Sequence, residues 1–151
     1  MADVFSKAKR SEVMSRIKNR NTKPELTVRS LLHRMGYRFR LHRTNLPGKP
    51  DIVLPRYQTV IFVHGCFWHR HKDCRFAYTP KTRVEFWVKK LESNVIRDQV
   101  VKVDLEQLGW QVVTVWECEL RDLKNLETRI GLFLVTPTVG SHSETYRLLT
   151  K

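Results

Sequence analysis

The chain has 151 residues and carries 28 Lys and Arg side chains against 15 Asp and Glu, which gives a formal net charge of +13. This length suits one domain with a real core, and no stretch resembles a membrane span or a secretory leader, so we expect an unprocessed cytoplasmic protein. Residues 1–50 hold 13 basic and only three acidic residues. Such a basic arm indicates contact with nucleic-acid phosphates, and a solvated basic surface is the alternative.

Two helices are predicted in the amino-terminal third. Residues 11–19 carry apolar side chains on one side among basic ones, which is typical of a short helix. Thr22 and Glu25 fit a capping box with Pro24 in the first turn. The apolar stripe that follows predicts a helix that continues to Gly36.

Strands are predicted next. Apolar residues alternate over 37–41, and residues 46–50 form a turn rich in Pro and Gly. The short apolar runs at 51–54 and 59–63 are separated by a second turn, so they predict an antiparallel pair.

The rest of the chain alternates helix and strand. A second capping box at 82–85 predicts a long helix that ends at Gly109, with an apolar stripe of Trp87, Leu91, Val95, Val101, Leu105 and Leu108. Residues 110–116 predict a strand. A last helix carries Leu123, Leu126, Ile130 and Phe133, and the Ser- and Thr-rich tail after it is expected to be loosely ordered. This order predicts a mixed α/β domain.

The segment 64–76 concentrates the unusual chemistry of the chain. It holds three of the six histidines, two of the three cysteines and three aromatic residues. Soft metal ligands, groups that transfer protons and flat stacking surfaces therefore share one loop. A structural role needs only one of these sets, whereas a nucleic-acid enzyme can use all three.

The cysteines indicate a metal site. Cys66, His71 and Cys74 have the spacing C-x4-H-x2-C, which lets one loop wrap a tetrahedral ion. Cys118 lies two residues after the strand at 110–116 and would complete four ligands if that strand neighbours 59–63. We expect one structural zinc ion, because a Cys3His site has no open position. Three unrelated buried thiols are the alternative.

Asp51 and His64 mark a second candidate site. Asp51 begins one strand, and His64 ends its expected antiparallel neighbour. In the restriction-endonuclease-like nuclease core, an Asp in this place and groups on the next strand hold magnesium against a phosphate. No Glu-x-Lys follows on the second strand here, so the arrangement is incomplete. A simple turn cap after Pro50 remains the alternative role of Asp51.

Many spaced motifs resemble the very short patch repair (Vsr-type) DNA mismatch endonucleases, over roughly residues 1–134. The matching motifs are Arg10-Ser11 with Met14, Pro47 to Asp51, Ile61 to His69, Thr82-Arg83 with Glu85 to Trp87, Asn94 with Arg97-Asp98, Leu108 to Trp110 and Val115 to Cys118. This number of matches argues against chance similarity. The tail after about residue 135 has no motif that matches.

The resemblance implies an enzyme that nicks one strand of duplex DNA 5′ to the thymine of a T·G mismatch produced by deamination of 5-methylcytosine. It implies a restriction-endonuclease-like core with a mixed sheet flanked by helices. The expected parts are a basic arm at 1–20 that embraces DNA, a nuclease domain at 21–134 and the tail at 135–151. We expect a monomer at the bacterial nucleoid, with other repair proteins as further partners. Two alternatives are a restriction-type enzyme that cuts both strands and a zinc-stabilised DNA-binding module without catalysis.

The resemblance also implies residue roles in catalysis. Asp51 and the backbone carbonyl of Val63 would hold magnesium, and two such ions would clamp the phosphate. The family often has Thr in place of Val63, but the main chain supplies the ligand. His69, with an ordinary pKa of roughly 6.5, would be the general base. His64 and Glu25 would orient waters or the phosphate. Pairing of the histidines with surface carboxylates and capping by Glu25 are the alternatives.

The resemblance also implies that recognition of the mismatch rests on an aromatic wedge that enters the duplex, formed by Phe67, Trp68 and Trp87. Mismatched steps unstack more readily, so a wedge favours damaged DNA. Met14 would enter from the opposite groove. Trp87 also fits the core stripe of the long helix, and Lys90 and Asn94, one turn apart, are placed to read base edges or phosphates. The resemblance selects His71, rather than His69, for zinc.

Overall fold

The computed structural model describes residues 6–9 and 20–134, and a mixed four-stranded sheet forms its centre. The strands are β1 (Arg40–Leu41), β2 (Ile52–Leu54), β3 (Thr59–His64) and β4 (Gln111–Trp116), in that spatial order. The first three strands pair antiparallel, whereas β4 runs parallel to β3. The predicted mixed α/β domain is therefore confirmed. Among the described residues, no helix is long and apolar enough to cross a membrane.

The parallel pair determines where the functional loops meet. Residues of β3 and β4 align from Thr59 opposite Gln111 to His64 opposite Trp116. Parallel strands end at the same edge of a sheet. The loop after β3 and the short helix η2 (Glu117–Arg121) after β4 therefore leave the sheet side by side.

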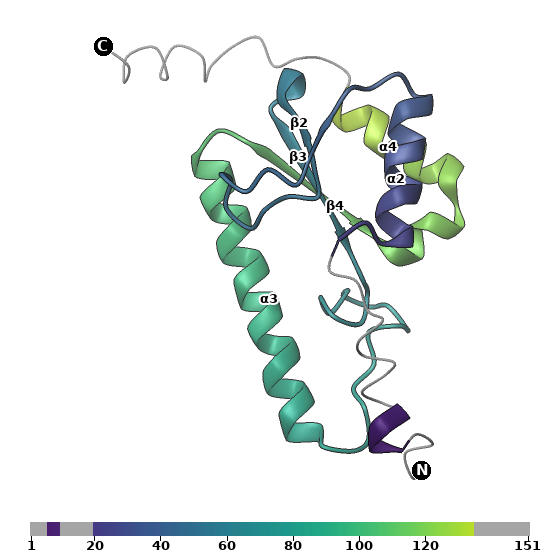
Figure 1. The fold of residues 1–151 in the computed structure, drawn as a ribbon, viewed down its shortest axis with the longest axis vertical. Helices are drawn as coiled ribbons and strands as arrows, with labels where there is room; N and C mark the ends of the chain where they lie inside the picture. Colours follow the sequence, from purple (N-terminus) through teal and green to yellow (C-terminus); the bar gives the residue numbers. More distant parts are fainter. Residues whose placement is uncertain (1–5, 10–19, 135–151) are drawn as a thin grey trace.

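Alternating side chains fill two cores, one on each face of the sheet. Ile52, Leu54 and Ile61 face the helices α2 (Lys23–Arg34) and α4 (Leu123–Phe133). Val53 and Val60 face the opposite way, toward Leu105 of α3 (Val84–Gln107). Figure 1 shows α2 and α4 together on one side of the sheet and α3 on the other.

Helix α3 reaches well past the sheet (Figure 1). It has 24 residues, which span about 36 Å, whereas a six-residue strand spans about 20 Å. Only its carboxyl-terminal half can lie on the strands. Of the expected apolar stripe, Leu105 is buried against the sheet and Leu91 is buried in the amino-terminal half of the helix, whereas Leu108 at the carboxyl end is exposed. Phe133 of α4 is also exposed.

Helix starts agree only in part with the sequence patterns. Thr22 caps α2 by accepting a hydrogen bond from the Glu25 backbone, as predicted, but the Glu25 carboxylate accepts from the Asn21 backbone instead of from Thr22. The capping box at 82–85 is wrong. Arg83 precedes α3 in a left-handed conformation with a φ of 53°, which displaces Thr82 from the capping position, and no side chain caps the helix.

Other expectations differ in extent. The strand expected over 37–41 is reduced to Arg40–Leu41, and Tyr37 and Phe39 before it pack against the core of the α2 side. The turn at 46–50 fits tightly under α3, where a side chain on Gly48 would collide with Val101. The helix expected over 11–19, with Met14, and the tail at 135–151 lie outside the described residues.

Candidate metal centres and active site

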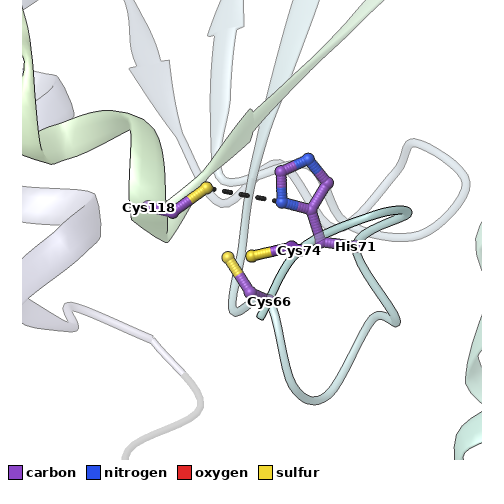
Figure 2. A group of neighbouring side chains, drawn as sticks. All are labelled: Cys66, His71, Cys74 and Cys118. Atoms are coloured by element: carbon purple, nitrogen blue, oxygen red, sulfur yellow. Dashed lines mark hydrogen bonds between the residues drawn. The ribbon is translucent and has the colours of Figure 1, made fainter. Parts of the chain in front are cut away.

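Four soft ligands from two separate segments converge beside the end of the sheet (Figure 2). Cys66, His71 and Cys74 lie on the loop after β3, and Cys118 lies on η2. Their ligand atoms all lie within 4.8 Å of one another, and Cys118 Sγ is 3.4 Å from His71 Nδ1. The structure thus places His71, and not His69, with the three cysteines.

Short turns fold the loop back on itself. The backbone N–H of His71 donates to Cys66, and that of Cys74 donates to His71, at 3.0 and 3.3 Å. Arg70 and Asp73 adopt left-handed conformations that tighten these turns. Each turn returns the next ligand to the same centre.

The last residue of β4 orients the histidine. The Trp116 ring stacks on the His71 ring with centroids 4.2 Å apart and an interplanar angle of 8°. Burial raises the pKa of the Cys66 thiol to about 12, and the backbone N–H of Phe76 lowers that of Cys74. Because a metal ion binds the thiolate form, it would replace these protons. The four donors fit one tetrahedral ion and leave no open position.

Asp51 lies directly before β2 and faces β3. Its Oδ2 accepts a hydrogen bond of 2.8 Å from the backbone N–H of Val63. Burial raises the Asp51 pKa to about 6, and Glu25 contributes to this rise, whereas the Val63 hydrogen bond, His69 and Arg29 oppose it. Asp51 therefore interacts with both of the side-chain groups described next.

The first group surrounds Glu25, a carboxylate only 3% exposed. Its Oε2 accepts from the Asn21 backbone at 2.9 Å and from Arg29 Nη2 at 3.2 Å. A buried carboxylate needs such partners, and Arg29 supplies the balancing charge. The ligand atoms of Glu25, His42 and Asp51 all lie within 4.8 Å of one another.

Arg29 contacts three members of this group through one nitrogen. Its Nη2 lies 2.9 Å from Asn21 Oδ1, 3.2 Å from Glu25 Oε2 and 2.9 Å from His42 Nε2. A guanidinium only donates hydrogen bonds and keeps its charge, so Arg29 is a cation of this group. His42 Nε2 also lies 3.7 Å from Glu25 Oε2.

The second group joins His64, His69 and Asp98 of α3. His69 Nδ1 lies 2.6 Å from Asp98 Oδ2, and the His64 and His69 rings stack at 3.7 Å with an interplanar angle of 6°. The Asp98 contact assigns the proton to Nδ1 and leaves Nε2 of His69 free to accept one. Burial, together with His69, lowers the His64 pKa to about 4, so His64 is neutral near pH 7. These three residues line a groove of about 380 Å³.

Aromatic rings gather where α3 extends beyond the sheet. Phe67 has ring centroids 5.1 Å from Trp68, 5.1 Å from Tyr78 and 5.6 Å from Trp87. The buried core clusters of the described residues do not include Trp87, so it is an aromatic-cluster residue rather than a core residue. Asn94 Nδ2 donates to the Trp68 carbonyl at 3.0 Å and thereby ties the loop to α3.

Four residues near these groups were not predicted from the sequence to belong to a site. Arg29 follows Glu25 by four residues on one helix, a spacing that does predict an ion pair. Asp98 lay within a matching motif but received no role. His42 and Tyr78 had no recognisable pattern, because His42 reaches Glu25 only through a left-handed turn after β1 and Tyr78 reaches Phe67 only through the loop fold. Lys90 is exposed, and its expected contact with DNA stays a prediction.

Comparison with solved structures identifies the fold. The catalytic domain of the homing endonuclease I-Bth0305I superposes with a TM-score of 0.56 and 22% sequence identity, covering 78% of this chain and 99% of that domain. The mixed sheet with flanking helices therefore has the restriction-endonuclease-like fold, and the Cys and His cluster beside it is able to hold a metal ion.

Sequence comparison identifies the family. The family model for the DNA mismatch endonuclease Vsr matches residues 2–75. The type II nicking enzyme V.XorIIP of Xanthomonas oryzae pv. oryzae is 52% identical over 130 residues, which cover 86% of this chain and 95% of that protein. The DNA mismatch endonuclease Vsr of Escherichia coli is 48% identical over 126 residues, which cover 83% of this chain and 80% of that protein. The chain belongs to the Vsr family and is a DNA endonuclease.

Proposed function

We propose that this endonuclease nicks one strand of duplex DNA 5′ to the thymine of a T·G mismatch left by deamination of 5-methylcytosine. The observation that carries the proposal is the position of Asp51 at the sheet edge where the aromatic loop begins. Its carboxylate accepts a hydrogen bond from the Val63 N–H, and its ligand atom lies within 4.8 Å of those of Glu25 and His42. The names of the relatives, a mismatch endonuclease and nicking enzymes, support the same activity.

Magnesium is the proposed catalytic metal, with two ions bound at Asp51. The Val63 N–H points toward Asp51, and in an extended strand the N–H and C=O of one residue face the same neighbour. The Val63 carbonyl is therefore a suitable second oxygen ligand, and the lack of a second strand carboxylate is no obstacle. Bound magnesium would polarise the phosphate and stabilise the leaving oxygen.

His69 is the proposed general base. Asp98 holds the proton on Nδ1, so Nε2 can take the proton of the attacking water. Neutral His64 stacks on the His69 ring and keeps that ring in position. Glu25, which pairs with Arg29 at 3.2 Å, would orient a water molecule or the phosphate near Asp51.

Zinc is the proposed ion of the Cys66, His71, Cys74 and Cys118 site. We expect about one zinc ion per chain, and we expect Cys118→Ala to lower the melting temperature as well as the nicking rate. Cys118 is the ligand that ties the loop to η2, so its loss uncouples the two segments. Elemental analysis and thermal unfolding measure both effects. Exposed Lys124 offers a control, since Lys124→Ala should keep zinc and stability; unchelated protein without zinc would overturn the assignment.

DNA recognition is proposed to divide between charge and stacking. The basic arm at 1–20 would add affinity for any duplex, in a way that falls steeply with salt. That contribution cannot separate T·G from C·G. Discrimination by the nuclease domain at 21–134 would rest on stacking groups, namely Phe67, Trp68 and Trp87, with Met14 of the arm. Lys90 is placed for phosphates or base edges, and Asn94 also holds the Trp68 loop.

Replacing Trp68 tests the wedge. Trp68→Ala should weaken binding to a T·G duplex by roughly 1–3 kcal/mol, the scale for one stacked base, and should barely change binding to matched DNA. Fluorescence-anisotropy titration of both duplexes at two salt concentrations measures this difference. An equal loss for both duplexes would show that Trp68 is a packing residue.

One assay tests the proposed function as a whole. The protein is incubated with matched and T·G duplexes, with and without magnesium, and each strand is labelled separately. We expect a nick in the thymine strand of the T·G duplex only when magnesium is present. A double-strand break would favour a restriction-type enzyme, and the absence of any cleavage would reject the proposed reaction.

A further inference from the structure

Tyr78 is the most exposed aromatic residue in the described part of the chain. Its side chain is 62% exposed, compared with 47% for Phe86 and 40% for Phe133. A single exposed aromatic ring is common on a protein surface and by itself carries no function. Two features of its surroundings distinguish Tyr78 from such a residue.

The first feature is the anchoring of its backbone. Arg70 Nη1 donates to the carbonyl of Ala77 at 3.4 Å and to Oγ1 of Thr79 at 3.1 Å. One guanidinium thus holds the residues on both sides of Tyr78. The backbone N–H of Ala77 also donates to Cys74 at 3.0 Å, which joins this segment to the metal loop. The exposed ring therefore projects from a fixed segment.

The second feature is the position of the ring. Its centroid lies 5.1 Å from that of Phe67 with an interplanar angle of 42°. Phe67 in turn contacts Trp68 and Trp87, so Tyr78 forms the outer end of the aromatic cluster. One part of the ring rests on Phe67, and the remainder is accessible to a ligand.

The surrounding charge indicates what that ligand is. Residues 70–83 carry five basic side chains and one acidic side chain, Asp73. An aromatic ring within a basic surface is the arrangement with which proteins bind unstacked bases and their phosphates. A ring on a fixed backbone also loses little freedom on binding, so more of the stacking energy appears as affinity.

We propose that Tyr78 is a base-stacking residue, which receives an unstacked nucleobase beside the mismatch, and that Arg70 is its positioning residue. The proposal rests on the proposed function, because it places Tyr78 next to the wedge formed by Phe67, Trp68 and Trp87. It adds a fourth ring to the proposed DNA-contacting surface and gives Arg70 the role of holding that ring in position.

The test compares Tyr78→Leu with Tyr78→Phe, which keeps the ring. The fluorescent base 2-aminopurine is placed next to the mismatch, and its quenching on binding reports stacking. Tyr78→Leu should reduce the quenching and weaken T·G binding by about 5- to 100-fold, while Tyr78→Phe stays within about twofold of wild type. Arg70→Met should give an intermediate loss. Phe133→Leu, an exposed aromatic replacement on α4, is the matched control and should change nothing.

Two further measurements separate the inference from the proposed function. An oligonucleotide with unpaired 2-aminopurine tests stacking without any mismatch. The role of Tyr78 is supported if Tyr78→Leu loses the quenching of this probe while Tyr78→Phe and Phe133→Leu keep it. If wild-type protein prefers T·G but Tyr78→Leu behaves like wild type on both probes, the inference is wrong and the proposed function stands. If wild-type protein shows no T·G preference, the proposed function fails. A lower melting temperature with equal loss for all DNA would make Tyr78 a packing residue and overturn the inference.

Discussion

An Asp51→Asn variant should lose strand nicking by on the order of 1000-fold or more, while it still binds the T·G duplex. The amide keeps the shape of the carboxylate and a carbonyl oxygen for the Val63 N–H, but it lacks the charge that binds magnesium. Metal catalysis contributes several kcal/mol to transition-state stabilisation, and each 1.36 kcal/mol is about tenfold in rate. Single-turnover nicking over a range of magnesium concentrations measures the loss, and anisotropy measures binding.

The same variant should be more stable than the wild type when no magnesium is added. Burial raises the Asp51 pKa to about 6 from 3.8, so the folded protein holds this proton more tightly than the unfolded chain. The free energy of unfolding therefore falls as the pH rises through this window. The penalty at pH 7 is on the order of 3 kcal/mol, since each pKa unit corresponds to about 1.36 kcal/mol, and Asn removes it. Denaturant unfolding should show the difference at pH 7 and its disappearance near pH 4.

Added magnesium should stabilise the wild type and leave Asp51→Asn unchanged. The His64 pKa is lowered to about 4, so the free energy of unfolding also falls as the pH drops from 6.5 toward 4. This contribution of His64 is common to both proteins and cancels in the comparison. Asp104→Asn, an exposed change on α3, is the control and should nick normally. Normal turnover in Asp51→Asn would move the catalytic metal to other ligands.

Local patterns predicted the parts of the fold that depend on local structure. The apolar run of β3 and the Thr22 cap of α2 both follow from residues close together in sequence, and both are observed. The exposed end of α3 could not be predicted in this way, because apolar periodicity does not reveal that the helix is longer than the strands it covers. The failed cap at 82–85 has a similar origin, since the loop enters α3 through the left-handed Arg83.

The candidate sites show the same division. The spacing of Cys66, His71 and Cys74 was readable because one loop holds all three. Cys118 joined them only on the condition that two strands were neighbours, and strand order depends on the whole fold. His42 was unreadable for this reason, since the pairing of β1 with β2 brings it to Glu25 and Asp51. A resemblance supplied roles for single residues, but the structure identified their supporting partners, Arg29 and Asp98.

His69→Ala should slow nicking by on the order of 100-fold or more with little change in the affinity for DNA. In the proposed mechanism, Nε2 of His69 accepts the proton of the attacking water. The other two histidines of the described site are less suited to this role, because His42 Nε2 lies against Arg29 at 2.9 Å and burial lowers the pKa of His64 to about 4.

Two companion variants separate the base from its supports. Asp98→Asn keeps the size of the side chain but can present an amide N–H to His69 Nδ1, which would favour the wrong tautomer and slow nicking without loss of binding. His64→Ala removes only the stacked neighbour of His69, at 3.7 Å, so it should slow nicking less than His69→Ala does. Single-turnover rates on the T·G duplex rank the three variants. If His64→Ala proves the slowest and His69→Ala turns over normally, the proton acceptor is His64, and the Asp98–His69 pair serves only to hold the loop against α3.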